Sequence, residues 1–241
     1  MTGVCSAAAP PAEATDLWDV QIGFPLWAPS LEGEIGVRGR SANVDVDFDD
    51  IWDSLDFMFP LNIEVRYCHH WLFFANTLYT ENSVDGEPGR VLGAVGVSEV
   101  QLKEKDILSD FGIGYNLFPY KAVRLEPFLG GRLVSLDAEL EFNVPGPNPE
   151  FSDSKTWVDP IIGAYLKVPA GRVFALFAEA DVGGFSVSSD ITWQAQGGVE
   201  FSLKHFYSRL TYRHLEIDYE DGGFIYDVKM SGPQLEIGFR F

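Results

Sequence analysis

The sequence of 241 residues lacks any uninterrupted apolar run of the ~20 residues that a helix needs to cross a bilayer. It has two cysteines, too few for a disulfide scaffold. Basic residues are scarce, with 17 Lys and Arg against 36 Asp and Glu and a formal net charge of -19, so nucleic-acid binding is excluded because phosphates would be repelled. Aromatic residues are abundant instead. A chain with 19 Phe, 9 Tyr and 6 Trp cannot stay solvated, which excludes disorder as its overall state.

The amino terminus carries no signal for ordered structure. Ala12-Glu13-Ala14 resembles the cleavage site of a secretory signal, but no apolar core precedes it. We interpret residues 1–25 either as the remainder of an export signal or as a disordered tail. Cys5 is then either lipidated or removed with the signal segment, and the sequence does not decide between these outcomes.

Strict alternation of apolar and polar residues dominates the rest of the chain. Phe57, Phe59, Leu61, Ile63 and Val65 share one face of a segment whose other face is polar. Such alternation is typical of a strand with one apolar and one polar face. It predicts ten strands, near 30–40, 57–67, 71–80, 99–117, 124–142, 156–167, 172–184, 190–203, 206–219 and 224–241.

Two irregularities accompany this pattern. The alternation slips near 104–106 and 133–135, where the strands either contain bulges or outrun the apolar layer. The segment from Asp47 to Leu55 is predicted to be helical, because Ile51 and Leu55 are four residues apart and acidic residues lie at its start.

The connections between the predicted strands alternate between short and long. Short connections occur near 69–70, 119–122, 168–171 and 204–205, and long polar ones at 41–56, 81–98 and 143–155. An even number of strands, with short turns beside the termini and longer loops opposite, is the pattern of an outer-membrane barrel. We therefore expect an all-β fold: an antiparallel transmembrane β-barrel of about ten strands over residues 26–241, with periplasmic termini.

A soluble β-sandwich also alternates, and it is the main alternative for the fold. Aromatic residues at the ends of the apolar faces favour the membrane barrel, because such belts lie at the two membrane interfaces. The first predicted belt contains Phe57, Phe59, Tyr79, Trp157 and Trp193, and the second contains Trp71, Tyr115, Phe201, Phe206, Phe239 and Phe241. The chain ends on Phe239-Arg240-Phe241, which resembles the carboxy-terminal signal that the barrel-assembly machinery reads.

Four segments carry a resemblance to a family. They are Trp157-Val-Asp-Pro-Ile-Ile-Gly163, Ala180-Asp-Val-Gly-Gly-Phe185, Ser189-Asp-Ile-Thr-Trp-Gln194 and Tyr219-Glu-Asp-Gly-Gly-Phe-Ile-Tyr-Asp227. These segments resemble a group of largely uncharacterised outer-membrane β-barrel proteins of Gram-negative bacteria. The resemblance covers about residue 26 to the end and is most specific in the last 85 residues. It implies fold and location but no activity.

Charged residues of the polar faces should fill the lumen. Alternation assigns seventeen of them to it: Glu32, Glu34, Arg38, Arg40, Glu64, Arg66, Asp110, Glu126, Arg132, Asp159, Glu179, Asp181, Glu200, Arg209, Arg213, Glu236 and Arg240. Because acids and arginines nearly balance, we expect ion pairs that plug a narrow interior, with a narrow pore or ligand pocket as the alternative. The candidate site residues are Glu64, Arg66, Asp159, Glu179, Asp181, Gln194, Gln196, Arg209, Arg213 and Glu236.

Catalytic and metal-binding patterns are weak. His214 is near the outer end of its strand, and Glu216 and Asp218 follow it on the same face, so a small His/acid cluster is conceivable there. An interfacial histidine is the preferred interpretation, and we expect no enzyme, cofactor or metal. The excess acid lies in the loops, including Asp45, Asp47, Asp49, Asp50, Asp53 and Asp56, without the spacing of a known calcium loop.

Three functions remain open on the sequence alone. The first is a structural or surface-presenting barrel with acidic extracellular loops. The second is a narrow pore or small-ligand transporter, and the third is an outer-membrane hydrolase built on His214. The expected partners are outer-membrane lipid and lipopolysaccharide, with the barrel-assembly machinery during insertion; nucleic acid is not one, and the oligomeric state is not determined.

Overall fold

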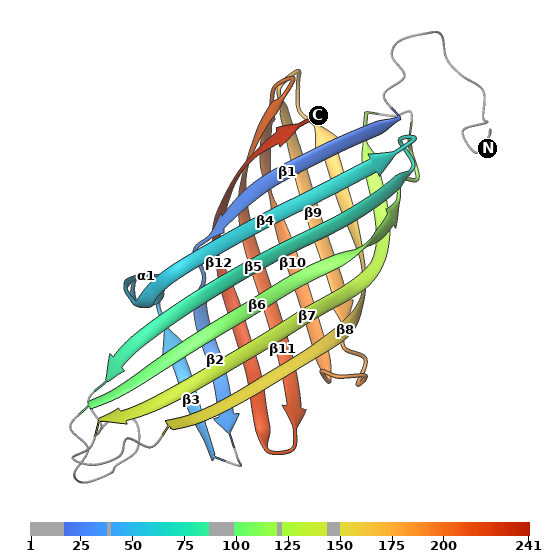
Figure 1. Ribbon diagram of the computed structural model, residues 1–241. Helices are drawn as coiled ribbons and strands as arrows, with labels where there is room; N and C mark the ends of the chain where they lie inside the picture. The colour runs from blue at the N-terminus through green and yellow to red at the C-terminus, as the bar shows by residue number, and fades with distance from the viewer. Residues whose placement is uncertain (1–16, 38–39, 87–98, 120–121, 144–149) are drawn as a thin grey trace, which may run out of the picture.

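The structure is a computed structural model that describes residues 17–37, 40–86, 99–119, 122–143 and 150–241. Its described residues form one antiparallel sheet in which ten strands close into a ring, because the first strand pairs with the last (Figure 1). The ring strands are β1 (Trp18–Trp27), β4 (Leu55–Tyr67), β5 (Trp71–Gly86), β6 (Glu99–Tyr115), β7 (Arg124–Asn143), β8 (Glu150–Pro169), β9 (Phe174–Gly183), β10 (Ile191–Ser202), β11 (Phe206–Asp221) and β12 (Phe224–Arg240). The expectation of a ten-stranded antiparallel barrel is confirmed.

The first strand of the ring, β1, was not among the predicted strands, and the strand expected near 30–40 is β2 (Ser30–Val37), which is not one of the ten ring strands. Residues 1–25 were expected to form a tail, but β1 begins at Trp18 and pairs with both β4 and β12. Its inward face contains Trp27 as well as Gln21, which disguises the alternation that would otherwise mark a strand. The prediction for Cys5 lies outside the described residues, while Cys68, in the turn after β4, is disulfide-bonded.

A hairpin and a helix extend the sheet beside this closing strand. β2 (Ser30–Val37) continues the path of β1 along β12, and β3 (Arg40–Val46) pairs with β2. The expected loop over 41–56 therefore contains β3 and the short helix α1 (Phe48–Ser54). The predicted helix is confirmed: Asp47 is its extended N-cap residue, and Asp49 and Asp50 occupy its first turn, where the helix dipole favours negative charge.

The strands on one side of the barrel are longer than expected. β5 continues to Gly86 and β8 begins at Glu150, so both strands include residues that the sequence pattern assigned to the loops 81–98 and 143–155. The register between β6 and β7 is continuous through 104–106 and 133–135, so neither slip in alternation is a bulge. The strands simply outrun the apolar layer there.

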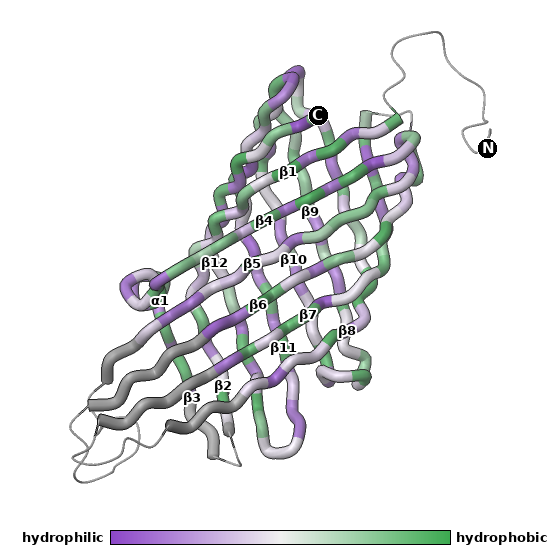
Figure 2. The backbone as a smooth tube through the Cα atoms, viewed as in Figure 1, coloured by the Kyte–Doolittle hydropathy of each residue, from purple (hydrophilic) through white to green (hydrophobic). Residues whose placement is uncertain are grey.

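The two ends of the barrel differ in which face is apolar. We call the end where β1 begins and β12 ends, which also holds the tight turns, the terminal half, and the opposite end the loop half (Figure 1). On β11 in the terminal half, Arg209 and Arg213 are buried inside while Leu210 is 63 % exposed on the outer wall. In the loop half of the same strand, Leu215 and Ile217 are fully buried inside. Figure 2 shows hydrophilic and hydrophobic residues alternating along the coloured parts of the strands.

This exchange of faces overturns two assignments. Glu32 and Glu34 were expected in the lumen, but Leu31 and Ile35 line the interior, and the two glutamates pair in register with Lys229 and Asp227 on the outer wall. Trp157 was expected in an outer aromatic belt but is buried inside. The physical reason is the same in both cases: beyond the apolar outer band the wall faces water, so the interior becomes the only place to bury apolar side chains.

The described helix cannot cross a bilayer, since no helix among the described residues is long and apolar enough.

Candidate functional site

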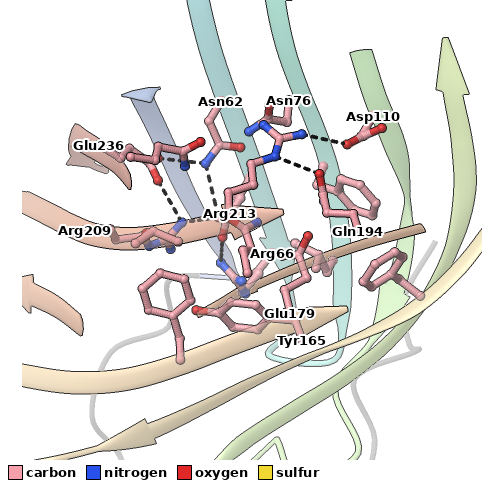
Figure 3. A pocket seen from close by; sticks show the side chains of 18 residues that line it. Asn62, Arg66, Asn76, Asp110, Tyr165, Glu179, Gln194, Arg209, Arg213 and Glu236 are labelled. Carbon is pink, nitrogen blue, oxygen red and sulfur yellow. Dashed lines mark hydrogen bonds and ion pairs between the residues drawn. The ribbon is translucent and has the colours of Figure 1, made fainter. Parts of the chain in front are cut away.

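The interior of the terminal half holds most of the predicted site residues. Eight of the ten are buried there or at its margin: Glu64, Arg66, Asp159, Asp181, Gln194, Arg209, Arg213 and Glu236. Glu179 and Gln196 are half-buried and line the same small cavity (Figure 3). Asp159 is separate from the others, because its carboxylate accepts hydrogen bonds from Trp157 and Ser189 instead of from an arginine.

One group of ion pairs is centred on two arginines. The Nη1 atom of Arg209 lies 2.8 Å from Glu64 and 3.3 Å from Glu236, and the Nη1 atom of Arg66 lies 2.8 Å from the other oxygen of Glu64. Arg66 also donates two hydrogen bonds of 3.0 Å to Glu126. Two-point pairing of this kind fixes the orientation of both side chains as well as neutralising their charges.

A second group of ion pairs adjoins the first and is centred on Arg132. Its guanidinium donates to Asp110 at 2.7 Å and to Asp181 at 3.0 Å. Arg213 donates from Nε to Gln194 at 2.8 Å, and its Nη2 atom lies 3.5 Å from Asp110. Every arginine named in these two groups therefore has an anionic or amide acceptor, which is the condition for keeping charges inside a barrel.

Together the two groups form what we call the polar plug. The cavity left among its side chains has a volume of about 50 Å³, which is room for a few water molecules and no larger solute (Figure 3). The expected side-chain-filled lumen is thus confirmed. The described residues leave no wide channel through the terminal half.

The loop half encloses an apolar chamber that the sequence analysis missed. Its volume is about 310 Å³, and its walls come from β2, β3, α1, β4, β5, β6, β7, β11 and β12. Representative lining residues are Leu31, Met58, Leu108, Val134 and Ile217. Inward positions on β11 change from Arg209 and Arg213 to Leu215 and Ile217, and this change of residue type along one face was the available signal.

Trp27 separates the plug from the chamber. Its indole lines the chamber, and the guanidinium carbon of Arg213 lies 4.5 Å from the centre of its ring. This distance permits a cation–π interaction. The charge of Arg213 is therefore in contact with the face of an aromatic ring where the polar plug meets the apolar chamber. The floor of the chamber is consequently built by the last residue of β1.

The wall of the chamber has an open seam. β1 pairs with β4 only up to Asn62, so residues 55–61 of β4 have no ladder partner on that side among the described residues. β3 pairs with β2 and, within the described part of the chain, with no other strand. Val44 and Val46 on β3 and Leu55 and Met58 on β4 line the chamber from the two edges of this seam.

Helix α1 lies at the seam. It connects β3 to β4, and Ile51 and Trp52 line the chamber, although Trp52 is 56 % exposed. An exposed pair of strand edges usually has to be covered, because unpaired backbone groups attract other chains. The seven-residue helix is the described segment that spans this seam, and its side chains line the chamber there.

Two buried polar atoms at the chamber have no hydrogen-bond partner in the described part of the chain. They are Nε1 of Trp27, a donor, and Oδ1 of Asn82, an acceptor. Six other buried polar atoms among the described residues also lack a hydrogen-bond partner, so these two do not by themselves identify a ligand.

Acidic residues of the loop half do not assemble into a metal site. Among the described residues, no group of three His, Cys, Asp or Glu side chains is placed to hold a metal ion. The six aspartates between Asp45 and Asp56 are distributed over β3, α1 and the start of β4.

Comparisons with known proteins support the fold but provide no relative in sequence. No protein-family model matches the chain, and no curated protein matches it either. The resemblance to an uncharacterised barrel family therefore stays a prediction.

Solved structures with a similar path of the chain are outer-membrane barrels. The outer membrane protease OmpT from Escherichia coli superposes with a TM-score of 0.59 at 10% identity, covering 94% of this chain and 97% of that one. The translocator domain of the autotransporter NalP from Neisseria meningitidis gives 0.47 at 10% identity, covering 95% and 90%. Such low identity carries no activity across, and only the first score is high enough to compare folds. The closed antiparallel ring and this likeness together show that the chain has the fold of outer-membrane β-barrel proteins.

Proposed function

We propose that the chain is an integral outer-membrane protein of a Gram-negative bacterium that binds a small, neutral, hydrophobic molecule in the chamber of its loop half. The observation that carries this proposal is an apolar chamber of about 310 Å³ with an open seam in its wall. That volume lies at the lower end of the range for small-molecule pockets, which are mostly apolar with a few polar groups.

The outer wall supports this placement in the membrane. In the terminal half, exposed side chains such as Leu129, Ile162, Leu176 and Leu210 form an apolar band. Trp71 and Tyr115 at the terminal end pack together, as expected for an interfacial aromatic belt. In this proposal the terminal half spans the bilayer, the chain termini face the periplasm, and the loop half stands in the lipopolysaccharide layer.

The chemistry of the lining defines the ligand class. None of the described lining residues is Lys or Arg, so a carboxylate or phosphate would find no counter-charge in the chamber. Trp27 Nε1 and Asn82 Oδ1 offer one donor and one acceptor. A neutral apolar molecule with one hydroxyl group matches this lining, because the hydroxyl can accept from the donor or donate to the acceptor.

The access route is the seam between β3 and β4. The polar plug leaves about 50 Å³, so the ligand does not pass along the barrel axis. This argues against the narrow pore considered on the sequence alone. A purely structural or surface-presenting barrel, the first sequence hypothesis, would need neither a chamber nor a seam, which is why we prefer binding. The chamber itself is proposed as a binding site and not as a catalytic one.

The experiment that tests this proposal compares two probes that differ by one hydroxyl group. The purified chain in phospholipid vesicles is equilibrated with radiolabelled naphthalene or 2-naphthol, and uptake is compared with protein-free vesicles. Saturable excess uptake is expected, with 2-naphthol bound more tightly. Uptake identical to that of protein-free vesicles would refute the proposal.

A matched pair of variants locates the binding. Leu108→Trp fills the chamber and should abolish the saturable component, since an added indole leaves no room for the ligand. Leu210→Trp adds the same side chain to the outer wall and should leave it unchanged. Binding that survives Leu108→Trp in a folded barrel would place the ligand elsewhere.

A further inference from the structure

A serine and a histidine are hydrogen-bonded on the outer wall of the barrel, away from plug and chamber. Ser231 on β12 and His214 on β11 are partners in the strand register. The Oγ atom of Ser231 lies 2.6 Å from Nδ1 of His214. His214 stands out in the sequence but Ser231 does not, because the two residues are seventeen positions apart and meet only through strand pairing.

A glutamate lies on the other side of the same imidazole. Nε2 of His214 is 3.8 Å from Oε2 of Glu216. Glu216 is itself positioned by two neighbours: Trp193 donates from Nε1 to Oε2 at 3.2 Å, and Nζ of Lys229 lies 3.6 Å from Oε1. The indole of Trp193 also packs against His214, with ring centroids 4.5 Å apart.

The order of these contacts has a chemical meaning. If the Ser231 hydroxyl donates to Nδ1, then the proton of the neutral imidazole is on Nε2, facing Glu216. A hydroxyl nucleophile, an imidazole that accepts its proton, and a carboxylate on the far side of the imidazole are the parts of a serine hydrolase site. The Glu216 contact is longer than a hydrogen bond, as catalytic contacts without substrate often are.

The cluster lies at the level where the outer wall changes from apolar to charged. Toward the terminal half, Tyr212 is the next outward residue on β11 and Leu235 is the second outward residue after Ser231 on β12, and both are exposed. Toward the loop half, the next outward residues are Glu216, which belongs to the cluster, and its register partner Lys229. In the proposed membrane placement this is the boundary between acyl chains and head groups, where the ester carbonyls of lipids lie.

We propose that Ser231, His214 and Glu216 form a lipid esterase site on the outer wall, acting on a fatty-acyl ester of a phosphate-bearing membrane lipid. Lys229, whose side chain is 54 % exposed and lies on the same face two residues from Ser231, supplies a cation for the phosphate. Phospholipids and lipopolysaccharide both offer this combination of ester and phosphate. The proposal depends on the membrane placement but not on ligand binding in the chamber.

The reaction balances with water as the second substrate. Oγ of Ser231 attacks the ester carbonyl as its proton moves to Nδ1 of His214, and the imidazolium then protonates the departing alcohol. A water molecule from the interface, deprotonated by His214, attacks the acyl-serine. A fatty acid is released, and the proton returns to Ser231. Glu216 is a positioning residue that acts through His214.

The first experiment measures fatty-acid release from two kinds of vesicle. The full chain is inserted either into vesicles of phosphatidylethanolamine or into vesicles that also contain purified lipopolysaccharide. Release above protein-free vesicles is expected in one or both, and the comparison identifies the source of the ester. Ser231→Ala and His214→Gln should each lower release by about 10²-fold or more.

A matched control and a chemical probe separate catalysis from folding. Ser208→Ala removes another serine from the outer wall of β11 and should leave release unchanged. A fluorophosphonate probe should label the wild-type chain on Ser231, as shown by mass spectrometry, and labelling should disappear in His214→Gln. Failure of the folded chain to label, together with no release from either vesicle, would overturn the proposal.

The role of Glu216 is tested by the rate of probe labelling, with the urea unfolding midpoint measured alongside to show that the fold is unchanged. Glu216→Gln should lower the rate of probe labelling, and Glu216→Asp should restore part of it, while all barrels keep the same unfolding midpoint in urea. Equal labelling rates in the wild type and Glu216→Gln would remove Glu216 from the site.

Discussion

The terminal and loop halves of the barrel are built from the same strands but with opposite distributions of polarity. In the terminal half β11 holds Arg209 and Arg213 inside and Leu210 outside, whereas in the loop half it holds Ile217 inside and Glu216 outside. The terminal half thus resembles a membrane barrel and the loop half a soluble one. Whether lipid or water surrounds the outer wall decides which face of a strand is apolar. A single strand can therefore be apolar on its outer face in one half and on its inner face in the other.

The largest effect is expected when the plug loses its central cation. Arg132→Met would leave Asp110 and Asp181 buried without their shared partner, and breaking a buried ion pair in this way costs about 3–5 kcal/mol. Urea unfolding of the vesicle-inserted barrel, followed by tryptophan fluorescence, measures the loss. Lys155→Met removes the more exposed pair with Asp221 and should cost less than ~1 kcal/mol. Equal losses for the two variants would mean that the plug is solvated.

The second-largest effect is expected when a charge is added to the outer wall, and its cost in stability should differ between the two halves. Leu210→Arg places a cation in the apolar band and is expected to destabilise the barrel by about 2–4 kcal/mol. Asp218→Arg, eight residues along the same strand and on the same face, should change stability by about 1 kcal/mol or less. Unfolding in urea compares the two variants, and similar values would show that the membrane band extends into the loop half.

Removal of interior methyl groups tests the loop half from the inside. Ile217→Ala deletes a fully buried side chain beside the chamber and should cost about 2–4 kcal/mol. Ile237→Ala makes the same deletion on the outer wall of the terminal half, where the side chain is 43 % exposed, and should cost about 1 kcal/mol or less. The same urea assay applies. An outer-wall deletion that costs more than the inner one would contradict the assignment of faces.

The smallest effect concerns the boundary between plug and chamber. Trp27→Phe removes an indole N–H that has no partner in the described chain but keeps an aromatic ring near Arg213. Binding of 2-naphthol should weaken by roughly tenfold or less, the value of about one hydrogen bond, while naphthalene binding stays unchanged. Dialysis with both probes measures the difference. Equal weakening for the two probes would mean that Trp27 acts only by packing.

Alternation alone predicted the ring, because period-2 patterning is set by the two faces of each strand. It predicted the ten-stranded architecture correctly and placed most plug residues inside. Arg66, Arg209 and Glu236 are at the level of the apolar outer band, and at that level the polar face of each strand points into the barrel. It also gave α1, whose acidic first turn is a local signal.

The remaining features depended on information that alternation does not contain. Glu32 and Trp157 were assigned to the wrong faces, because parity was read with one rule for the whole length of the barrel, whereas the rule reverses in the loop half. The chamber and its seam result from where β1 stops pairing with β4. The contact between Ser231 and His214 depends on the register of two strands, which no local pattern specifies.

The last strand has a consequence for biogenesis. β12 contacts three neighbours, β11, β1 and β2, so the ring and the hairpin both depend on this one strand. Contacts of such long sequence separation form slowly, and a chain shortened by even one strand would present two unsealed edges. Sealing of the ring and attachment of the hairpin are thereby coupled, because both require the same strand to be in place.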